Sequence, residues 1–428
     1  MKKLILSFAF VLTASLVSGQ ALTKEQIKAQ KKEQKALMLK VKEAEKAIVN
    51  GDNAGALNMV QSALNSPLTN TDAYVWYVAS KAKKGLIDGE NYKRSQAQPF
   101  NAEMMYNSAY DIFDYLIKCD KYDKQPNAKG KVAPKYSLEV VAMMYENRNQ
   151  LFNGGAYFYN AEKFDDAFKQ FDMFIKTATL EPLDTLPAVK DKELNSNAAY
   201  YATLCGMQTE NYQNVLAHID LAIQNPDFKE NATRYKAQAQ VSLADTTAWL
   251  QTLKLGAKEF PKNPYFYQCL IVYYQEKDKQ DEILKFADEM IASNPDNALF
   301  YSAKGVVLQE NNKLDEAIVY YKKALEKDAN DEGSLFNLAK CYNDLAFEYS
   351  QKSASTNIND KAKIKKDKEI INGYFQEALP LYEKLRELQP NKVEKWGPGL
   401  SNCYYNLKIK EKEAEEITKL LEKAAEEE

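Results

Sequence analysis

The chain has 428 residues, with 57 Lys and Arg against 60 Asp and Glu, a single His, and a formal net charge of −3. A surface that binds duplex nucleic acid is normally basic, so this balance argues against nucleic acid as a partner. A chain of this length exceeds what one hydrophobic core usually serves. The sequence therefore predicts either several domains or one elongated array.

The first segment, Met1 to Gly19, has two lysines followed by the apolar and small run LILSFAFVLTASLVSG. A basic start followed by an apolar run is typical of a secretory signal peptide, with cleavage expected after Gly19 or Ala21. A single membrane anchor is the weaker alternative, because the run is short and ends in small residues. We therefore expect a periplasmic or secreted protein with no transmembrane span after cleavage.

The segment Leu22 to Ala47 carries eight Lys and four Glu with a weak helical period, and predicts a leading helix that is partly solvated. Its functional interpretation is a basic arm for an anionic envelope surface. That interpretation is the weaker one at this stage, because acidic residues are mixed among the lysines.

A first helical hairpin follows, with Gly51 and Asp52 in its turn, Ala56 and Ala63 on its second helix and Pro67 at its end. A second unit begins near Asp72 with Trp76 as its leading aromatic residue.

The content of Gly, Asp, Ser and Pro in Gly85 to Phe100 predicts a loop that interrupts this unit before a helix over Ala102 to Lys118. A linker over Lys121 to Pro134 ends an N-terminal helical region with degenerate hairpins, residues 22–134.

Residues 135–428 are predicted to form the main array. A helical pattern returns over Leu138 to Leu151, a clear unit follows in GAYFYNAEKFDDAFKQF, and the prolines of Thr179 to Asp191 loosen the register. A weaker hairpin spans Asn197 to Pro226. From Glu230 onward the period is tight.

Pro261 and Pro295 are 34 residues apart, and the clearest copy of the repeat runs from Asp296 to Asn330. Its spaced large and small residues predict two amphipathic helices packed on each other: Tyr301, Gly305, Leu308, Ala317, Tyr321 and Ala324. This pattern resembles the tetratricopeptide repeat (TPR). The resemblance implies an all-α, right-handed α-solenoid of about nine hairpins. Lys304 departs from the motif, which expects Leu before Gly305.

One hairpin is lengthened near residues 345–377, because Ala378, Tyr382 and Pro390 arrive 27 residues late. Within the insertion, residues 345–372, we expect a polar turn over Ser350 to Asp360 and a helix over Lys361 to Asn372, which together make a protruding finger. Its five lysines are interpreted first as a solvated helix face and second as a site for an acidic partner or lipid headgroups: Lys361, Lys363, Lys365, Lys366 and Lys368. Residues 411–428 are predicted to be a capping helix.

The resemblance implies that a protein or peptide partner binds along the inner face formed by the first helices. The inner-face positions carry aromatic residues, amides and two cations: Phe152, Asn153, Tyr159, Tyr200, Tyr201, Arg234, Tyr265, Gln268, Phe336, Asn337, Lys340 and Asn343. The alternative is that several of these aromatics only pack adjacent repeats. Of the residues that a carboxylate clamp of this family needs, only Asn337 and Lys340 are similar, so that ligand is not predicted.

The sequence offers little for catalysis. His218 is alone, no phosphate-binding loop or nucleophile elbow occurs, and the five cysteines are far apart. We therefore expect a non-enzymatic scaffold in cell-envelope or secretion assembly, with no cofactor and no metal. A carbohydrate-binding or carbohydrate-processing envelope protein is the alternative, because 28 tyrosines could stack on sugar rings. Self-association into a homo-oligomer is a third hypothesis.

Overall fold

The computed structural model describes residues 23–127, 130–354 and 359–427, so the predicted signal peptide, Met1 to Gly19, lies outside the described residues. Within these ranges the chain forms α-helices and two short 3₁₀-helices, and no strand. The predicted all-α fold is confirmed. The chain divides into two compact units, of which unit 1 ends at Asp245 and unit 2 begins at Thr246. The predicted boundary near 134 falls inside unit 1, between two helices.

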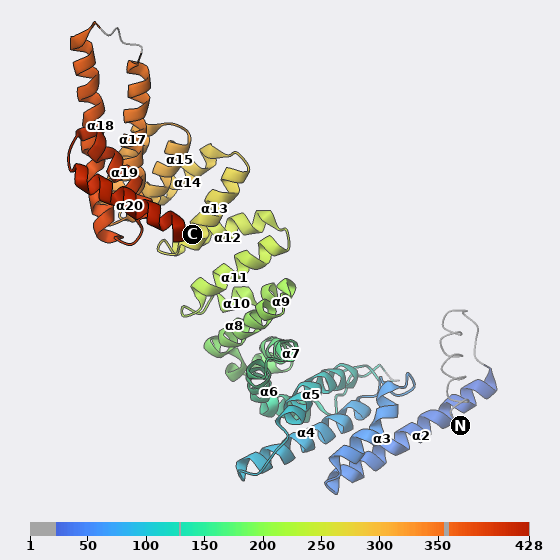
Figure 1. The fold of residues 1–428 in the computed structure, drawn as a ribbon. Coiled ribbons are helices and arrows are strands. Elements are labelled where there is room, and N and C mark those ends of the chain that lie inside the picture. The colour runs from blue at the N-terminus through green and yellow to red at the C-terminus, as the bar shows by residue number, and fades with distance from the viewer. Residues whose placement is uncertain (1–22, 128–129, 355–358, 428) are drawn as a thin grey trace. The chain divides into compact units, whose positions relative to one another are not determined.

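Figure 1 shows each unit as a succession of helices. The helices of unit 1 are α2 (Lys24–Val49), α3 (Asn53–Asn65), α4 (Ala73–Ser95), α5 (Ala102–Asp123), α6 (Ser137–Asn160), α7 (Phe164–Lys176), η1 (Leu183–Thr185), η2 (Pro187–Lys190), α8 (Lys192–Gln208), α9 (Tyr212–Ala217), α10 (Ile219–Ala222) and α11 (Lys229–Ser242). The helices of unit 2 are α12 (Thr246–Glu259), α13 (Pro264–Glu276), α14 (Gln280–Ser293), α15 (Ala298–Glu310), α16 (Leu314–Lys327), α17 (Glu332–Ser353), α18 (Lys361–Leu388), α19 (Val393–Leu407) and α20 (Glu411–Glu427). Within the described residues no helix is both long enough and apolar enough to cross a bilayer.

Many of these helices begin at an Asp or Asn whose side chain accepts a hydrogen bond from a backbone N–H in the first turn. Asp52 accepts from Gly55 at 2.8 Å, and Asn297 accepts from Leu299 at 3.1 Å. Such N-caps satisfy donors that the helix itself leaves free, and each contributes about 1 kcal/mol. The Asp and Asn residues at these positions therefore mark the helix starts in the sequence.

The turns inside the hairpins repeat a backbone conformation at a fixed interval. Glu210, Ala244, Asp278 and Asn312 all adopt positive φ, at 53°, 59°, 54° and 56°, and their residue numbers differ by 34 each time. Each residue follows the last turn of a first helix and reverses the chain into the second. The 34-residue period therefore begins by Glu210, which places the weak hairpin of Asn197 to Pro226 in the same register as the strong ones.

The spaced glycines let the two helices of a hairpin approach closely. A Cβ atom at Gly305 would lie 2.7 Å from the ring of Tyr321, and one at Gly155 would lie 2.6 Å from the ring of Phe171. Both rings are almost completely buried. The small residue on the first helix and the aromatic residue sixteen positions later on the second thus form one packing unit, which is the contact that the TPR-like spacing predicts.

The loop predicted over Gly85 to Phe100 is wrong for most of its length, because α4 continues as a helix to Ser95. Gly85 lies against the side chain of Asn53 on α3, where a larger residue would clash. Glu90 is buried and accepts a hydrogen bond from the backbone N–H of Asn101 at 2.6 Å. Gly85 serves close packing and not a turn, and only residues 96–101 connect α4 to α5.

The lengthened hairpin is confirmed. Figure 1 shows α17 and α18 running side by side beyond the neighbouring helices of unit 2. Helix α17 continues to Ser353, so the predicted turn starts later than Ser350, while α18 begins at Lys361 as expected. Tyr349 of α17 donates a hydrogen bond to the buried carboxylate of Asp367 on α18, at 3.1 Å. The finger, defined here as residues 345–354 and 359–372, is thus held together by its own contacts.

A buried cation anchors the irregular segment over Thr179 to Asp191 in unit 1. The Arg148 guanidinium of α6 donates to Thr177 Oγ1 at 2.8 Å, to Asn195 Oδ1 at 2.6 Å and to the Val189 carbonyl at 3.3 Å. Burial lowers the pKa of Arg148 to about 10. Arg148 therefore joins α6, α7 and α8 around the segment where the prolines loosen the repeat.

His218 lies between α9 and α10, where the second helix of the weak hairpin is interrupted. Its Nε2 atom is 2.8 Å from Asp172 Oδ1 on α7. The side chain therefore links the break in one hairpin to the preceding hairpin.

Helix α20, Glu411–Glu427, occupies the range in which the sequence predicts a helix. Ile417 is buried, and Ala414, Leu421 and Ala424 pack against the same apolar cluster, while the remaining side chains with an assigned exposure are exposed or half-buried. One apolar side and one polar side are what a terminal cap of a repeat array needs.

Candidate partner-binding surfaces

Four of the aromatic residues predicted for the inner face lie in unit 1, and they pack on neighbouring helices. Phe152 contacts the rings of Phe171 and Phe174 edge to face, with centroids 5.6 and 5.5 Å apart. Tyr201 is stacked on Phe171 at 5.7 Å, and Tyr159 meets Tyr201 at 6.0 Å. These rings stabilise the α6–α7–α8 packing, as the alternative interpretation expects.

Tyr200 makes the closest ring contact of this group. Its ring is parallel to that of Phe228, with centroids 4.1 Å apart and an angle of 2°. Arg234 on α11 lies 5.1 Å from the ring of Tyr235, which itself contacts Tyr200. Asn153 is exposed on α6. The predicted aromatic residues of α6 and α8, together with Arg234 of α11, are thus linked through ring contacts. Other protein groups cover most of the ring faces.

The first helices of unit 2 present a different surface. On α13, Tyr265 is half-buried and Gln268 is exposed, and Val272 continues the same row with 52% of its surface exposed. On α17, Phe336 is half-buried and Lys340 is exposed. Residues three or four apart lie on one side of a helix, so these side chains form rows along α13 and α17.

The row on α17 ends at Phe347, which has 64% of its surface exposed. The predicted residues Asn337 and Asn343 are half-buried. Asn343 donates a hydrogen bond to the Tyr382 hydroxyl at 3.2 Å, and the Cys403 thiol donates to its Oδ1 atom at 3.9 Å. Asn343 therefore takes part in packing α17 against α18 and α19, while Phe347 faces solvent.

Sequence reasoning did not identify Phe347 or Tyr405 as site residues. Tyr405 on α19 is 81% exposed, and α17 and α19 contact each other. The spacing held a signal for Phe347, because it follows Phe336 by eleven residues, which is three helical turns. The sequence does not single it out, because the predicted insertion begins at residue 345, before the row on α17 ends. We call Phe336, Lys340, Phe347 and Tyr405 the exposed aromatic surface of unit 2.

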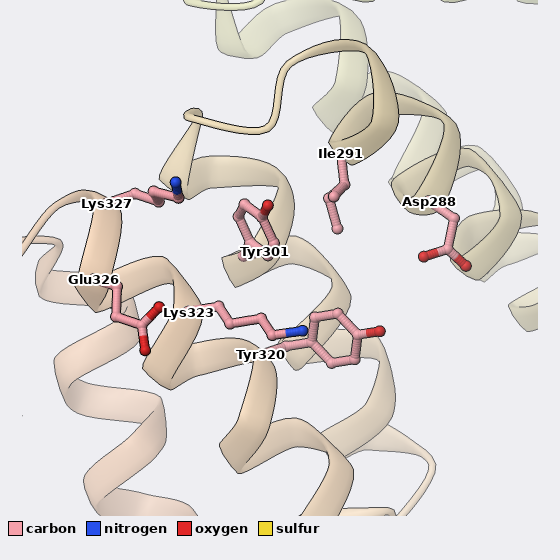
Figure 2. Close-up of a pocket in the computed structure, with 7 residues that line it drawn as sticks. All are labelled: Asp288, Ile291, Tyr301, Tyr320, Lys323, Glu326 and Lys327. Atoms are coloured by element: carbon pink, nitrogen blue, oxygen red, sulfur yellow. The ribbon is translucent and has the colours of Figure 1, made fainter.

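A pocket of about 290 Å³ opens between α14, α15 and α16 on another part of unit 2. Figure 2 shows its lining residues: Asp288, Ile291, Tyr301, Tyr320, Lys323, Glu326 and Lys327. The Tyr301 hydroxyl donates to the Pro295 carbonyl at 3.0 Å, and Lys327 pairs with Asp296 at 2.8 Å. Two acids and two lysines line the space, so the pocket carries no excess charge that would select an ion.

The same region explains why Lys304 replaces the leucine of the motif. Its Nζ atom is 2.5 Å from Asp288 Oδ1 and 4.3 Å from the centre of the Tyr320 ring. Burial lowers the pKa of Lys304, but the hydrogen bonds to Asp288 and Tyr320 outweigh burial, and the pKa is raised. Lys304 thus connects α15 to both α14 and α16 at the edge of the pocket.

The histidine and most of the cysteines, which are potentially catalytic side chains, have structural roles. The histidine is paired, and these cysteines are buried. His218 pairs with Asp172, which also accepts from Lys176 at 2.7 Å. All five cysteines are free thiols, and burial raises the pKa of Cys119, Cys205, Cys341 and Cys403 to about 12. A thiol must ionise to act as a nucleophile, so these four are poorly suited to that role. No cluster that could hold a metal ion occurs among the described residues.

The hairpins, the repeated turns and the glycine–aromatic contacts define an α-helical repeat protein. Its 34-residue period and its motif positions are similar to those of the tetratricopeptide repeat.

Solved structures of TPR proteins are similar to the chain at low identity. A TPR repeats protein from Bacteroides fragilis is 19% identical over 60% of this chain and 98% of its own, with a TM-score of 0.34. The TPR domain of P58(IPK) is 12% identical over 87% and 98%, with a TM-score of 0.29, and MamA is 13% identical over 47% and 92%, with a TM-score of 0.31. At TM-scores below 0.5 the likeness does not extend to a ligand, a partner or an activity. No family model and no curated protein matches the chain.

Proposed function

We propose that the protein is a non-enzymatic scaffold that binds a peptide or protein partner along the first helices of its repeats. The observation that carries this proposal is the exposed aromatic surface of unit 2, where Phe347 and Tyr405 leave 64% and 81% of their surface in solvent. Aromatic residues are enriched among the residues that dominate binding energy at interfaces. Exposed on adjacent helices, they are suited to an apolar or amphipathic partner segment.

Lys340 lies between Phe336 and Phe347 on α17 and is exposed. A partner with an acidic residue between two apolar residues matches this order of aromatic, cation and aromatic. The rows on α13 and α17 are both on first helices, so an extended segment can contact more than one repeat.

The carbohydrate-binding alternative has no comparable support. Tyr200 and Tyr201 each have one ring face covered, by Phe228 and Phe171. Stacking on a sugar needs a free ring face, and packing leaves each of these two tyrosines at most one.

Site-specific cross-linking tests the proposal. A photoreactive phenylalanine analogue at Phe336 or Tyr265 is expected to cross-link one cellular partner. The double variant Phe347→Ala/Tyr405→Ala should reduce that cross-link roughly tenfold or more, since an interface aromatic often contributes about 2 kcal/mol.

Val319→Ala is the matched control, because Val319 is an exposed apolar residue, 49% exposed, on the second helix α16. Equal cross-linking in the wild type and the double variant, or equal loss in the control, contradicts the proposal.

We further propose that the chain is exported to the periplasm or beyond and serves in cell-envelope or secretion assembly. The support is the apolar run after Lys2 and Lys3 in the sequence. Cell fractionation with intact-mass measurement of the protein is the test. A cytoplasmic protein that keeps residues 1–19 contradicts this part of the proposal without affecting the scaffold function.

A further inference from the structure

The rotation of α2 about its own axis is fixed by contacts on one side. Val41 and Ala44 are completely buried. Gln34 donates to the Leu68 carbonyl at 3.0 Å, and the Glu45 carboxylate accepts from the Tyr74 hydroxyl at 2.6 Å. These residues face α3 and α4, so the opposite side of α2 faces solvent.

Most lysines of α2 lie on that opposite side. The spacing of three, four or seven residues puts five of them in one row, with Lys24 and Lys31 at its edge: Lys28, Lys32, Lys35, Lys42 and Lys46. All seven are exposed, and none has an ion-pair partner among the described residues. Leu39 lies within the row and is 58% exposed. We call these seven lysines and Leu39 the outer face of α2.

Two of the four glutamates of the segment, Glu33 and Glu45, point away from this row. Glu45 faces α4, where it also lies 3.9 Å from Lys81. Glu33 follows Lys32 directly and therefore points about 100° away from it around the helix. Glu25 and Glu43 border the row, and the neighbouring helix α3 carries no charged side chain. The fold therefore turns two of the four acids away from the lysines, and the seven lysines outnumber the two acids that remain beside them.

We propose that the outer face of α2 docks on an anionic phospholipid surface. From Lys24 to Lys46 the row is about 33 Å long at 1.5 Å per residue, which spans several headgroups. The row lies along the outer side of a single straight helix, so all of it can contact a flat surface at once. Lysine ammonium groups on flexible stems pair with phosphates as mobile point charges. Leu39 adds a side chain that can enter the headgroup boundary.

The sequence position of α2 is consistent with this partner. The helix begins five residues after the apolar run that ends at Gly19. Whether that run is removed or kept, α2 is the first helix after it. An acidic protein is the competing partner. Its acidic side chains would have to match the order of the lysines along the row, whereas an anionic lipid surface can bind the row through charge density alone.

Vesicle co-sedimentation of the full chain, purified as the cell processes it, tests the proposal. Vesicles of phosphatidylcholine are compared with vesicles that also contain phosphatidylglycerol, at low and at high salt. The wild type is expected to bind the anionic vesicles more tightly, and salt should abolish the difference by screening. Because all variants share one N-terminus, verified by intact mass, a retained leader adds equally to both vesicle types.

The variant Lys28→Gln/Lys35→Gln/Lys42→Gln is expected to weaken the anionic preference about a hundredfold, since each lysine near such a surface contributes about a fivefold factor. The control Lys361→Gln/Lys365→Gln/Lys366→Gln makes the same charge change on the exposed start of α18. It should leave binding within about twofold. Equal loss in both variants, or no preference of the wild type for anionic vesicles, overturns the proposal. Circular dichroism of both variants confirms that each is folded.

Discussion

The two units place aromatic and cationic side chains differently on the same kind of repeat. In unit 1 the aromatics Phe152, Tyr200 and Tyr201 meet rings of neighbouring helices. In unit 2 the first helices carry Phe347 and Tyr405 with most of their surface in solvent. Aromatic side chains on first helices can therefore either join repeats or remain available to a partner.

The cations show the same contrast. Arg148 in unit 1 is 3% exposed and lies 3.7 Å from the centre of the Phe174 ring. Lys304 in unit 2 lies 4.3 Å from the Tyr320 ring at the edge of a pocket, and its partner Asp288 has 58% of its side chain exposed. The partners of Arg148 are buried, whereas the acidic partner of Lys304 lies largely in solvent.

The largest expected effect compares two phenylalanines. Phe171→Ala removes a ring that is 1% exposed and is expected to lower the free energy of unfolding by about 3–5 kcal/mol. Phe347→Ala should change it by less than about 0.5 kcal/mol, since the ring is mostly in solvent. Urea unfolding followed by circular dichroism measures both. If the two variants lose similar stability, the contrast between the units is wrong.

The next effect concerns the buried cation of unit 1. Arg148→Met leaves Asn195 Oδ1 without the donor that now lies at 2.6 Å. A buried acceptor that loses its partner costs about 1–3 kcal/mol. We expect a loss of about 2 kcal/mol in urea unfolding, with weaker hydrogen-exchange protection over η1 and η2. An unchanged midpoint would show that the segment is held by its apolar residues, Leu183 and Val189, instead.

A smaller, pH-dependent effect is expected at Asp172. Burial raises the pKa of this carboxyl group, but hydrogen bonds from His218 and Lys176 outweigh burial, so its pKa lies below the usual 3.8. The contribution to stability is therefore complete above the unfolded value and is lost as the pH falls through the lower, folded value. Thermal unfolding of Asp172→Asn should differ from the wild type near neutral pH and converge with it below pH 3.8. Asp166→Asn, on the exposed side of α7, is the control and should show a smaller difference at every pH.

The smallest effect is expected at Lys304. Lys304→Leu restores the residue that the motif expects and removes an ion pair whose acidic partner is largely exposed. Such pairs contribute between about 0 and 1 kcal/mol, and the added apolar contact offsets part of that loss. Urea unfolding should show a change within about 0.5 kcal/mol. A loss above about 2 kcal/mol would place Lys304 with Arg148 as an internal cation.

The fold could be predicted from local patterns in the sequence, namely residue spacing and helix-start residues. The spacing of Gly305 and Tyr321 predicts a contact that the structure contains, and Asp and Asn residues mark many helix starts. The error over Gly85 to Phe100 has a physical cause. Gly85 is small because Asn53 of another helix lies against it, and such a reason is not visible in a local pattern.

The candidate surfaces were less predictable, because exposure depends on which neighbours cover a side chain. The sequence places Tyr201 and Phe336 alike on inner faces, but only the structure shows that Phe171 covers Tyr201. The charges of α2 are a similar case. Their order in the chain is mixed, and the separation of lysines from Glu45 follows only when Val41 and Ala44 fix which side is buried.

The positive-φ turns also have a consequence for how such a chain can change its length. Asp278 and Asn312 hold the same backbone conformation at equivalent places. Deleting residues 279–312 would join one turn to the start of the next second helix without changing register, and would remove α14 and α15 as one module. Duplication of the same segment would add a module at the same junction. A gene encoding this array can therefore gain or lose whole periods in a single recombination event, while an insertion of another length interrupts the period, as the finger does.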